Sequence, residues 1–188
     1  VNQPLNSQPL SPQPQPPGAL AVVSVEDAQT NALTTANLAI SFAQLGLRTL
    51  LIDSNLRQPQ LNGLFDLQEH APGLTDLIAE RTSVAPTVID AARSLWVLPA
   101  GTRAPNPQEL LSSKHYQARV NPLIQHFDIT LFSTAPMDAT RDAQLVAAQA
   151  GAALLIAQRH ITQAKALAAT GKRLRELGVR LVGSTLLG

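Results

Sequence analysis

A loop from Val25 to Ala32 follows the first apolar run of the chain, Ala19–Ser24. A loop that holds phosphate in this position needs glycines that reach positive φ, a lysine for the β- and γ-phosphates, and a Ser or Thr hydroxyl for Mg²⁺. The loop reads Val-Glu-Asp-Ala-Gln-Thr-Asn-Ala, with no glycine and no lysine, and Glu26 and Asp27 add negative charge. We interpret it as a phosphate site whose ligands have been lost.

Two further positions could carry chemistry, because each ends an apolar run. Asp53 follows Leu50–Ile52 and would position Mg²⁺ or water in an enzyme, but we favour a carboxylate that caps the following turn. Ser133 follows Ile129–Phe132, where a nucleotide hydrolase places an acidic residue, and a hydroxyl cannot replace that residue.

The elements that must position these residues follow the pattern of a parallel α/β sheet. Helical spacing of Leu33, Ala36, Ile40 and Ala43 predicts a helix between the first run and a second strand at 48–53. Ligands of open α/β sheets bind at the carboxyl ends of strands, where the loop and Asp53 fall. Further strands are expected at 95–99, 129–132, 152–157 and 179–187, and helices at 73–80, 106–111, 116–126, 138–150 and 164–177.

Two of these helices have recognisable starts. Asn106 is expected to cap the helix that follows it, with Pro107 in the first turn and Glu109 completing a capping box. Asp138 and Asp142 are interpreted as dipole and cap partners in the first turn of the helix that ends before Gly151.

Composition restricts the classes of function. The 14 basic and 13 acidic residues give a net charge of +1, which predicts no nucleic-acid binding and no direct membrane attraction by bulk charge. There is no cysteine, and no apolar run approaches the roughly 20 residues that span a bilayer. The four histidines, His70, His115, His126 and His160, lack metal-ligand spacing, so no metal site is expected.

The chain divides into two parts. Residues 1–18 are rich in Pro, Gln and Asn, and we expect a disordered leader or linker. Residues 19–188 are expected to form a single P-loop-like α/β domain, a length that suits one core. Because the chain starts at Val1 and has one methionine, Met137, we expect it to be a fragment with sequence upstream.

The chain after Gly18 resembles the bacterial tyrosine autokinases of exopolysaccharide biosynthesis, in particular their chain-length-determinant kinase subgroup. The resemblance rests on the run Ser24–Leu56 with Arg57 and Pro59, on Leu64-Phe65, on Leu98–Gly101 and on Pro105–Leu111. That family is similar to MinD/ParA-like P-loop ATPases. It implies an α/β fold with a parallel sheet in a three-layer sandwich and helices on both faces.

The departures from the family pattern fall on its chemistry. Against that pattern, the vestigial positions are Ala28 and Thr30 for loop glycines, Asn31 for the phosphate-binding lysine, Ala32 for the Mg²⁺-binding hydroxyl, Asn55 for a second acidic residue and Ser133 for the Walker B aspartate. Leu187 falls near an Asn that touches adenine in relatives. Asp53 is the one catalytic acid retained, and Tyr116, the only tyrosine, lies mid-chain instead of in a C-terminal cluster.

These departures lead to the expectation of a pseudoenzyme, a scaffold or regulatory subunit of an exopolysaccharide system with no catalytic residues and no cofactor. One alternative is an ATP-binding tyrosine autokinase or ATPase with unusual ligands, or with ligands supplied by a partner and Mg²⁺ bound with ATP. A second is a MinD/ParA-like positioning adaptor. The expected partners are a P-loop homologue or an inner-membrane chain-length or synthase component, which would hold a cytoplasmic protein at the membrane.

Overall fold

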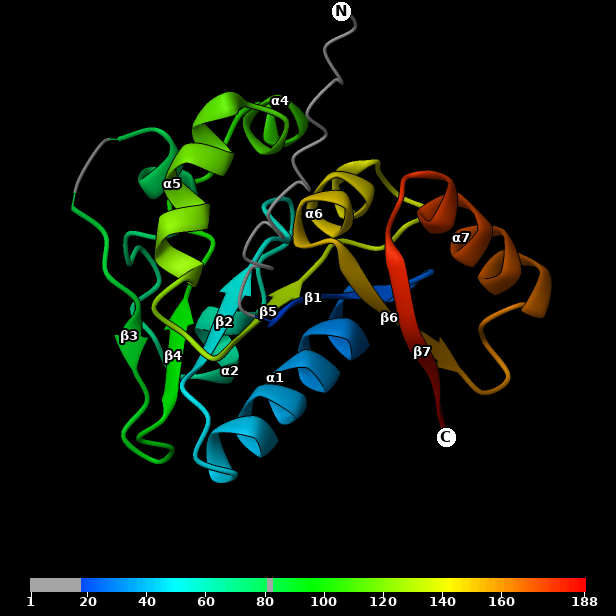
Figure 1. Ribbon diagram of the computed structural model, residues 1–188, viewed down its shortest axis with the longest axis horizontal. Helices are drawn as coiled ribbons and strands as arrows, with labels where there is room; N and C mark the ends of the chain where they lie inside the picture. The colour runs from blue at the N-terminus through cyan, green and yellow to red at the C-terminus, as the bar shows by residue number, and fades with distance from the viewer. Residues whose placement is uncertain (1–17, 81–82) are drawn as a thin grey trace, which may run out of the picture.

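The computed structural model describes residues 18–80 and 83–188 of the 188-residue chain. Among these residues one sheet runs in the order β3-β4-β2-β5-β1-β6-β7, and each neighbouring pair is parallel except β3 with β4. The predicted parallel α/β sheet is confirmed (Figure 1). The strands are β1 (Gly18–Ser24), β2 (Thr49–Asp53), β3 (Thr87–Val88), β4 (Leu95–Leu98), β5 (Ile129–Ser133), β6 (Ala152–Gln158) and β7 (Arg180–Leu187).

Helices cover both faces of the sheet and give the expected three layers (Figure 1). One face carries α1 (Ala28–Gln44) and the short α2 (Leu61–Leu64). The remaining helices pack on the opposite face. They are α3 (Leu74–Ile78), α4 (Pro107–Leu111), α5 (Lys114–Ile124), α6 (Asp142–Ala150) and α7 (Ala164–Glu176).

Strand β2 shows why the sequence produces this sandwich. Successive side chains of a strand point to opposite faces. Leu50 and Ile52 accordingly join the core beneath α3–α7, while Leu51 joins the core beneath α1. All three are fully buried. A strand covered on both faces reads as a continuous apolar run, which is the signal that predicted it.

Small side chains let α1 lie close to the sheet. Its inward face carries Ala32, Ala36, Ala39 and Ala43, spaced at helical intervals and all buried.

Near one edge of the sheet, Trp96 of β4 meets Phe127 edge to face, with ring centroids 5.4 Å apart and an interplanar angle of 66°. Trp96 therefore packs against the core.

Four details differ from the sequence-based expectations. Helix α2 and strand β3 were not predicted, because each is too short to show periodicity. Helix α6 begins at Asp142, so Asp138 precedes it and is not in its first turn. Asn106 makes no side-chain cap bond; its amide instead donates to the Glu109 carboxylate at 3.2 Å, so the expected capping box does not form.

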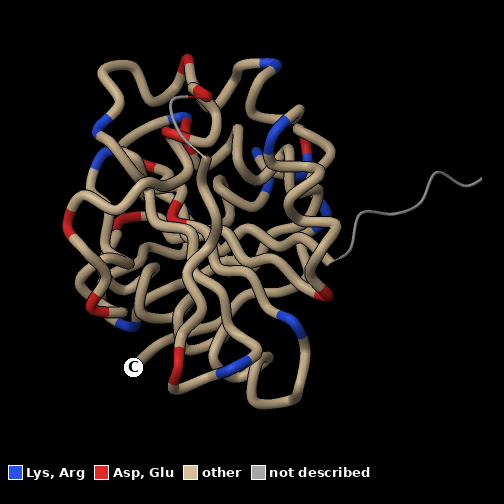
Figure 2. The backbone as a smooth tube through the Cα atoms, turned by 90° about the vertical axis from the view of Figure 1, so that its left-hand side faces the viewer, with Lys and Arg blue, Asp and Glu red and all other residues tan. Residues whose placement is uncertain are grey.

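Charged residues of both signs are interspersed along the backbone (Figure 2), as the net charge of +1 leads one to expect. Within the described ranges, no helix is long and apolar enough to cross a membrane. The same residues contain no group of three or more His, Asp or Glu side chains that could hold a metal ion. The expected leader lies outside the described residues, except for Gly18, which begins β1.

Candidate active site at the strand ends

The carboxyl ends of the three central strands β2, β5 and β1 meet at one edge of the sheet. The register places Ser133 beside Asp53 on one side and beside Val22 on the other. A cavity of about 450 Å³ opens at this edge, where ligands of parallel α/β sheets bind. It is lined by Glu26, Asp27, Ala28, Gln29, Asn55, Arg57, Gln58, Gln60, Ala135, Pro136, Ala139 and Thr140.

Asn31, at the position of the family lysine, points into the protein and is fully buried. Its side-chain nitrogen donates to the Val22 carbonyl at 2.8 Å. Its side-chain oxygen accepts from the Ser133 hydroxyl at 3.2 Å and from the Thr134 backbone N–H at 3.3 Å. Since every polar atom of its amide group has a partner, Asn31 ties α1 to β1 and β5 and does not face the cavity.

Asp27 caps α1 with its own carboxylate. It accepts from the Gln29 N–H at 2.9 Å and from the Thr30 hydroxyl at 2.6 Å. The Thr30 bond is the main reason why the pKa of Asp27 lies below its ordinary value. A helix N-terminus attracts anions, so this carboxylate takes the place that a phosphate group occupies in a P-loop.

The loop is also tied to the last residue of β6 and to the segment that follows this strand. The Gln158 side-chain nitrogen donates to the Thr30 hydroxyl at 2.6 Å, and the Thr162 hydroxyl donates to Glu26 at 2.9 Å. Hydrogen bonds between residues that are 128 and 136 positions apart in the chain thus hold this loop in place, although it contains no glycine.

Asp53 lies fully buried at the end of β2. One oxygen accepts from the Asn55 N–H at 3.1 Å, and the other accepts from the N–H groups of Gln60 and Leu61 at 2.9 and 3.0 Å. Burial raises the pKa of this carboxyl to about 6, although the three N–H groups oppose that rise. Asp53 caps the turn that leads into α2, and Asn55 supports the same turn by accepting from the Gln58 N–H at 3.2 Å.

Arg57 brings positive charge to the edge of the cavity. Its Nε donates to Asp142 at 2.7 Å, and the Asp142 side chain is 1% exposed while that of Arg57 is 42% exposed. The partner sits at the start of α6, so the ion pair joins the segment after β2 to the helix after β5. Among the described residues that line the cavity, Arg57 is the only Lys or Arg.

The residues around the cavity offer one group that suits a phosphate, and they offer few oxygen ligands for a magnesium ion. Arg57 supplies a guanidinium group, which suits phosphate. A magnesium ion needs free oxygen ligands, but both oxygens of Asp53 already accept bonds and Ala32 has no hydroxyl. The remaining ligands would have to come from the nucleotide, from water or from another chain.

The structure brings some of the vestigial positions together and separates others. Ala28 and Asn55 line the cavity. The side chains of Asn31 and Ser133 are buried and hydrogen-bonded to each other, and Ala32 faces the core under α1. Leu187 ends β7, where its carbonyl accepts from the Arg159 N–H at 2.8 Å. Sequence reasoning gave no role to Arg57, Gln158 or Thr162, because their partners lie far away in the chain.

Three curated relatives are bacterial tyrosine-protein kinases. The chain is 34% identical over 130 residues to the putative kinase CapB of Staphylococcus aureus, covering 69% of this chain and 57% of CapB. It is 32% identical to CpsD of Streptococcus pneumoniae over 138 residues, covering 73% and 61%. It is 32% identical to YwqD of Bacillus subtilis over 171 residues, covering 90% and 72%. The chain thus spans about three fifths of the first two relatives. No family profile matches it.

Solved structures share the fold. The kinase domain of the Escherichia coli tyrosine kinase ETK has a TM-score of 0.85 at 25% identity, over 94% of this chain and 69% of that one. The chimerical protein CapA2B2 has a TM-score of 0.85 at 23% identity, over 93% and 77%. MinD of Pyrococcus horikoshii, solved with Mg-ADP, has a TM-score of 0.75 at 18% identity, over 89% and 68%.

These comparisons correct two expectations from the sequence. The expectation that the chain is no enzyme is wrong, because the relatives are named tyrosine-protein kinases and a neighbour is a kinase domain. The expectation that it takes no cofactor is overturned by the same relatives, because a kinase transfers a phosphoryl group from a bound nucleotide. The absence of glycines and lysine concerns only the loop at 25–32. Arg57, from another segment, adds a positive charge to the same cavity.

Proposed function

The chain belongs to the family of bacterial tyrosine-protein kinases, and from that premise we propose that it is an ATP-binding domain of an exopolysaccharide system whose phosphate ligands are unusual. Its nucleotide would lie in the cavity at the ends of β1, β2 and β5. The observation that carries this proposal is Arg57, which faces that cavity and is held there by the buried Asp142.

Arg57 replaces only part of what a P-loop lysine supplies. Lysine reaches the β- and γ-phosphates from the helix start, whereas Arg57 approaches from the segment after β2. Its charge is partly balanced by Asp142, while Glu26 and Asp27 oppose a phosphate at the helix start. We therefore propose that a partner protein adds a second cation to the open side of the cavity, as an arginine finger does.

The acceptor of a phosphoryl group would not be Tyr116. Its side chain is 1% exposed within the core under α5, and its hydroxyl has no partner in the described structure. Burial raises the pKa of the phenol and keeps its oxygen from any nucleotide. Because Tyr116 is the only tyrosine of the 188 residues, a tyrosine acceptor would have to lie outside them.

The partner we propose is a P-loop homologue or an inner-membrane component of the polysaccharide system. Two observations support a protein partner: the cavity is short of cations, and a structural neighbour is the chimerical protein CapA2B2. Such a partner would hold the chain at the cytoplasmic face of the inner membrane.

The test is a calorimetric titration of the chain with MgATP and MgADP, alone and mixed with an intact kinase of the family. Micromolar binding, about −8 kcal/mol, is expected in the mixture, and weaker binding by the chain alone. Asp27→Asn should tighten binding several-fold, because it removes a negative charge from the helix start. Asp90→Asn, in the exposed turn between β3 and β4, is the matched control.

A second comparison isolates Arg57. Arg57→Ala should weaken nucleotide binding about tenfold, while Arg93→Ala, an exposed arginine near the amino end of β4, should leave it unchanged. Because Arg57→Ala leaves Asp142 buried without its partner, the double variant Arg57→Ala/Asp142→Asn is measured beside it. The intact kinase is also titrated alone, and the proposal is abandoned when the chain gives no heat up to millimolar nucleotide and the mixture gives no heat beyond that of the kinase alone.

A further inference from the structure

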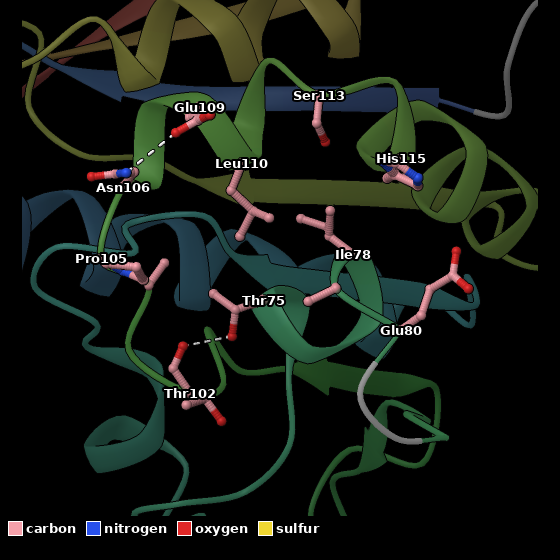
Figure 3. Close-up of a pocket in the computed structure, with 12 residues that line it drawn as sticks. Thr75, Ile78, Glu80, Thr102, Pro105, Asn106, Glu109, Leu110, Ser113 and His115 are labelled. Carbon is pink, nitrogen blue, oxygen red and sulfur yellow. Dashed lines mark hydrogen bonds between the residues drawn. The ribbon is translucent and has the colours of Figure 1, made fainter.

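A second cavity, of about 570 Å³, lies at the carboxyl end of β4, among α3, α4 and the start of α5 (Figure 3). Its walls come from α3 and the residue pair after it, from the loop 102–106 and from the Pro-Asn-Pro-Gln-Glu-Leu-Leu run, to which the nucleotide site assigns no role. Ile78 and Leu110 point toward each other across it. Thr75, Thr102, Asn106, Glu109 and Ser113 add polar groups around this apolar centre.

The wall beside Thr75 and Thr102 is rigidly built. Asp76 accepts from the Gly73 N–H at 3.0 Å and from the Thr102 N–H and hydroxyl at 2.9 and 2.7 Å. Thr75 in turn donates to the Thr102 carbonyl at 2.7 Å. A Cβ at Gly101, whose φ is +85°, would come within 3.0 Å of Asp76. The cavity is therefore formed in advance, which lowers the entropy cost of binding a ligand.

Two carboxylates line the cavity, and one of them lacks an ion-pair partner among the described residues. Glu80 is paired with Arg119. Glu109 contacts only the neutral amide of Asn106, at 3.2 Å, and makes no ion pair with any residue that the structure describes. A cationic group of a ligand would find an unpaired carboxylate next to an apolar slot.

This lining disfavours two other classes of ligand. A phosphate-bearing molecule would meet Glu109 and Glu80, and His115 is the one basic side chain in a lining that includes no Lys or Arg. A sugar commonly stacks on aromatic rings, and the lining includes no Phe, Tyr or Trp. An aliphatic slot with a carboxylate at its edge suits a peptide side chain with a basic neighbour.

The shape points the same way. Pro105, Asn106 and Glu109 also line a hollow of about 330 Å³ that continues over the start of α4 to Arg57. Arg57 in turn lines the cavity at the ends of β1, β2 and β5. This hollow and the cavity among α3, α4 and α5 (the α3–α5 cavity) share Pro105, Asn106 and Glu109 as lining residues, and an extended segment of several residues can reach two adjacent hollows where a compact molecule fills one.

We propose that the α3–α5 cavity is a docking site for a short extended peptide of a partner protein. The peptide places an apolar side chain between Ile78 and Leu110 and an adjacent Lys or Arg against Glu109. This binding needs no nucleotide, so it stands apart from the function proposed above.

The experiment uses the full chain and a fluorescein-labelled peptide, Gly-Ser-Lys-Leu-Lys-Ser-Gly, in polarisation titrations. Two control peptides replace both Lys by Glu, or Leu by Ser. Saturable binding of the first peptide is expected, with at least tenfold weaker binding of each control. Glu109→Lys should weaken the first peptide at least tenfold and favour the Glu peptide, while Glu69→Lys, on an exposed loop, should change neither.

Leu110→Gln tests the slot itself, because Leu110 is only half-buried and its replacement leaves the core residue Ile78 in place. It should weaken the Leu peptide and leave the Leu→Ser peptide unchanged. A peptide display selection against the wild type, counter-selected on Glu109→Lys, gives an unbiased check. Enrichment of an apolar residue beside Lys or Arg supports the proposal. Enrichment of acidic peptides, no enrichment, or binding that both variants leave intact overturns it.

Discussion

The side-chain nitrogen of Asn31 donates to the backbone carbonyl of Val22 at 2.8 Å, which fixes the start of α1 to the central strand β1. The same amide accepts from Ser133 and from Thr134 of the neighbouring strand end. Asn31 and Ser133, two positions at which the sequence departs from the family pattern, are therefore partners in a buried polar network. These hydrogen bonds hold α1, β1 and the end of β5 together at the edge of the sheet.

Replacing Asn31 tests this network. Asn31→Ala leaves the Thr134 N–H and the Ser133 hydroxyl buried without their acceptor, so we expect a loss of about 1–3 kcal/mol in the free energy of unfolding. Urea denaturation measures it. Asn37→Ala, an exposed position of the same helix, should stay within about 0.5 kcal/mol of the wild type. Equal effects at both positions would contradict the network.

The raised pKa of Asp53 predicts how stability depends on pH. The folded carboxyl has a pKa of about 6, whereas the ordinary value is 3.8, so between these values the folded state binds more protons than the unfolded state. Asp53 therefore stabilises the fold most at low pH, and this contribution falls as pH rises from about 4 to 6, by at most about 3 kcal/mol.

Urea denaturation of the wild type and of Asp53→Asn between pH 4 and 8 measures this contribution. Other titrating groups, including Asp27, are present in both proteins and cancel in the difference. The stability of the wild type relative to the variant should decline up to about pH 6 and be constant above it. Parallel curves over the whole range would show that Asp53 titrates normally.

The ion pair between Arg57 and Asp142 should be coupled more strongly than an exposed pair. Asp142 is 1% exposed, so its charge is poorly solvated without Arg57, although the half-exposed Arg57 weakens the effect. A double-mutant cycle with Arg57→Ala and Asp142→Asn should give a coupling energy of about 1–3 kcal/mol. The same cycle on Arg48 and Asp128, whose side chains are 58% and 38% exposed, should give less than about 1 kcal/mol.

The close contact between α3 and the segment after β4 depends on glycine. A Cβ at Gly73 would fall within 3.0 Å of the Pro99 carbonyl, which is backbone and cannot turn away. Gly73→Ala should therefore cost about 2 kcal/mol or more in chemical denaturation. Gly63→Ala, a helical position with nothing within 4 Å, should stabilise by about 0.5–1 kcal/mol. A small effect at Gly73 would mean that the two segments can move apart.

The sequence predicts the sheet well because the signals for it are local. Leu50–Ile52 is a continuous apolar run, and the alanines of α1 recur at helical spacing, so both elements are visible within a short window. The four-residue α2 and the two-residue β3 give no such signal, and the antiparallel pairing of β3 with β4 depends on tertiary contacts.

The candidate site was less predictable, since its bonds join distant residues. Ser133 and Asn31 are 102 positions apart, Arg57 and Asp142 are 85 apart, and neither pair shows any periodicity. The family pattern marked Asn31 and Ser133 as altered positions, but it did not show that they bond to each other. The inference from missing ligands to a missing activity compared positions one by one, and it is overturned by relatives that are named tyrosine-protein kinases.

The edge-to-face contact of Trp96 with Phe127 gives the protein an internal optical reporter. Trp96 is the only tryptophan of the chain, and it lies in β4, the strand that leads to Thr102 in the wall of the α3–α5 cavity. Its fluorescence will follow global unfolding in every denaturation experiment above. A change in that emission on adding a peptide, without denaturant, would report a shift of β4 itself, with no label introduced.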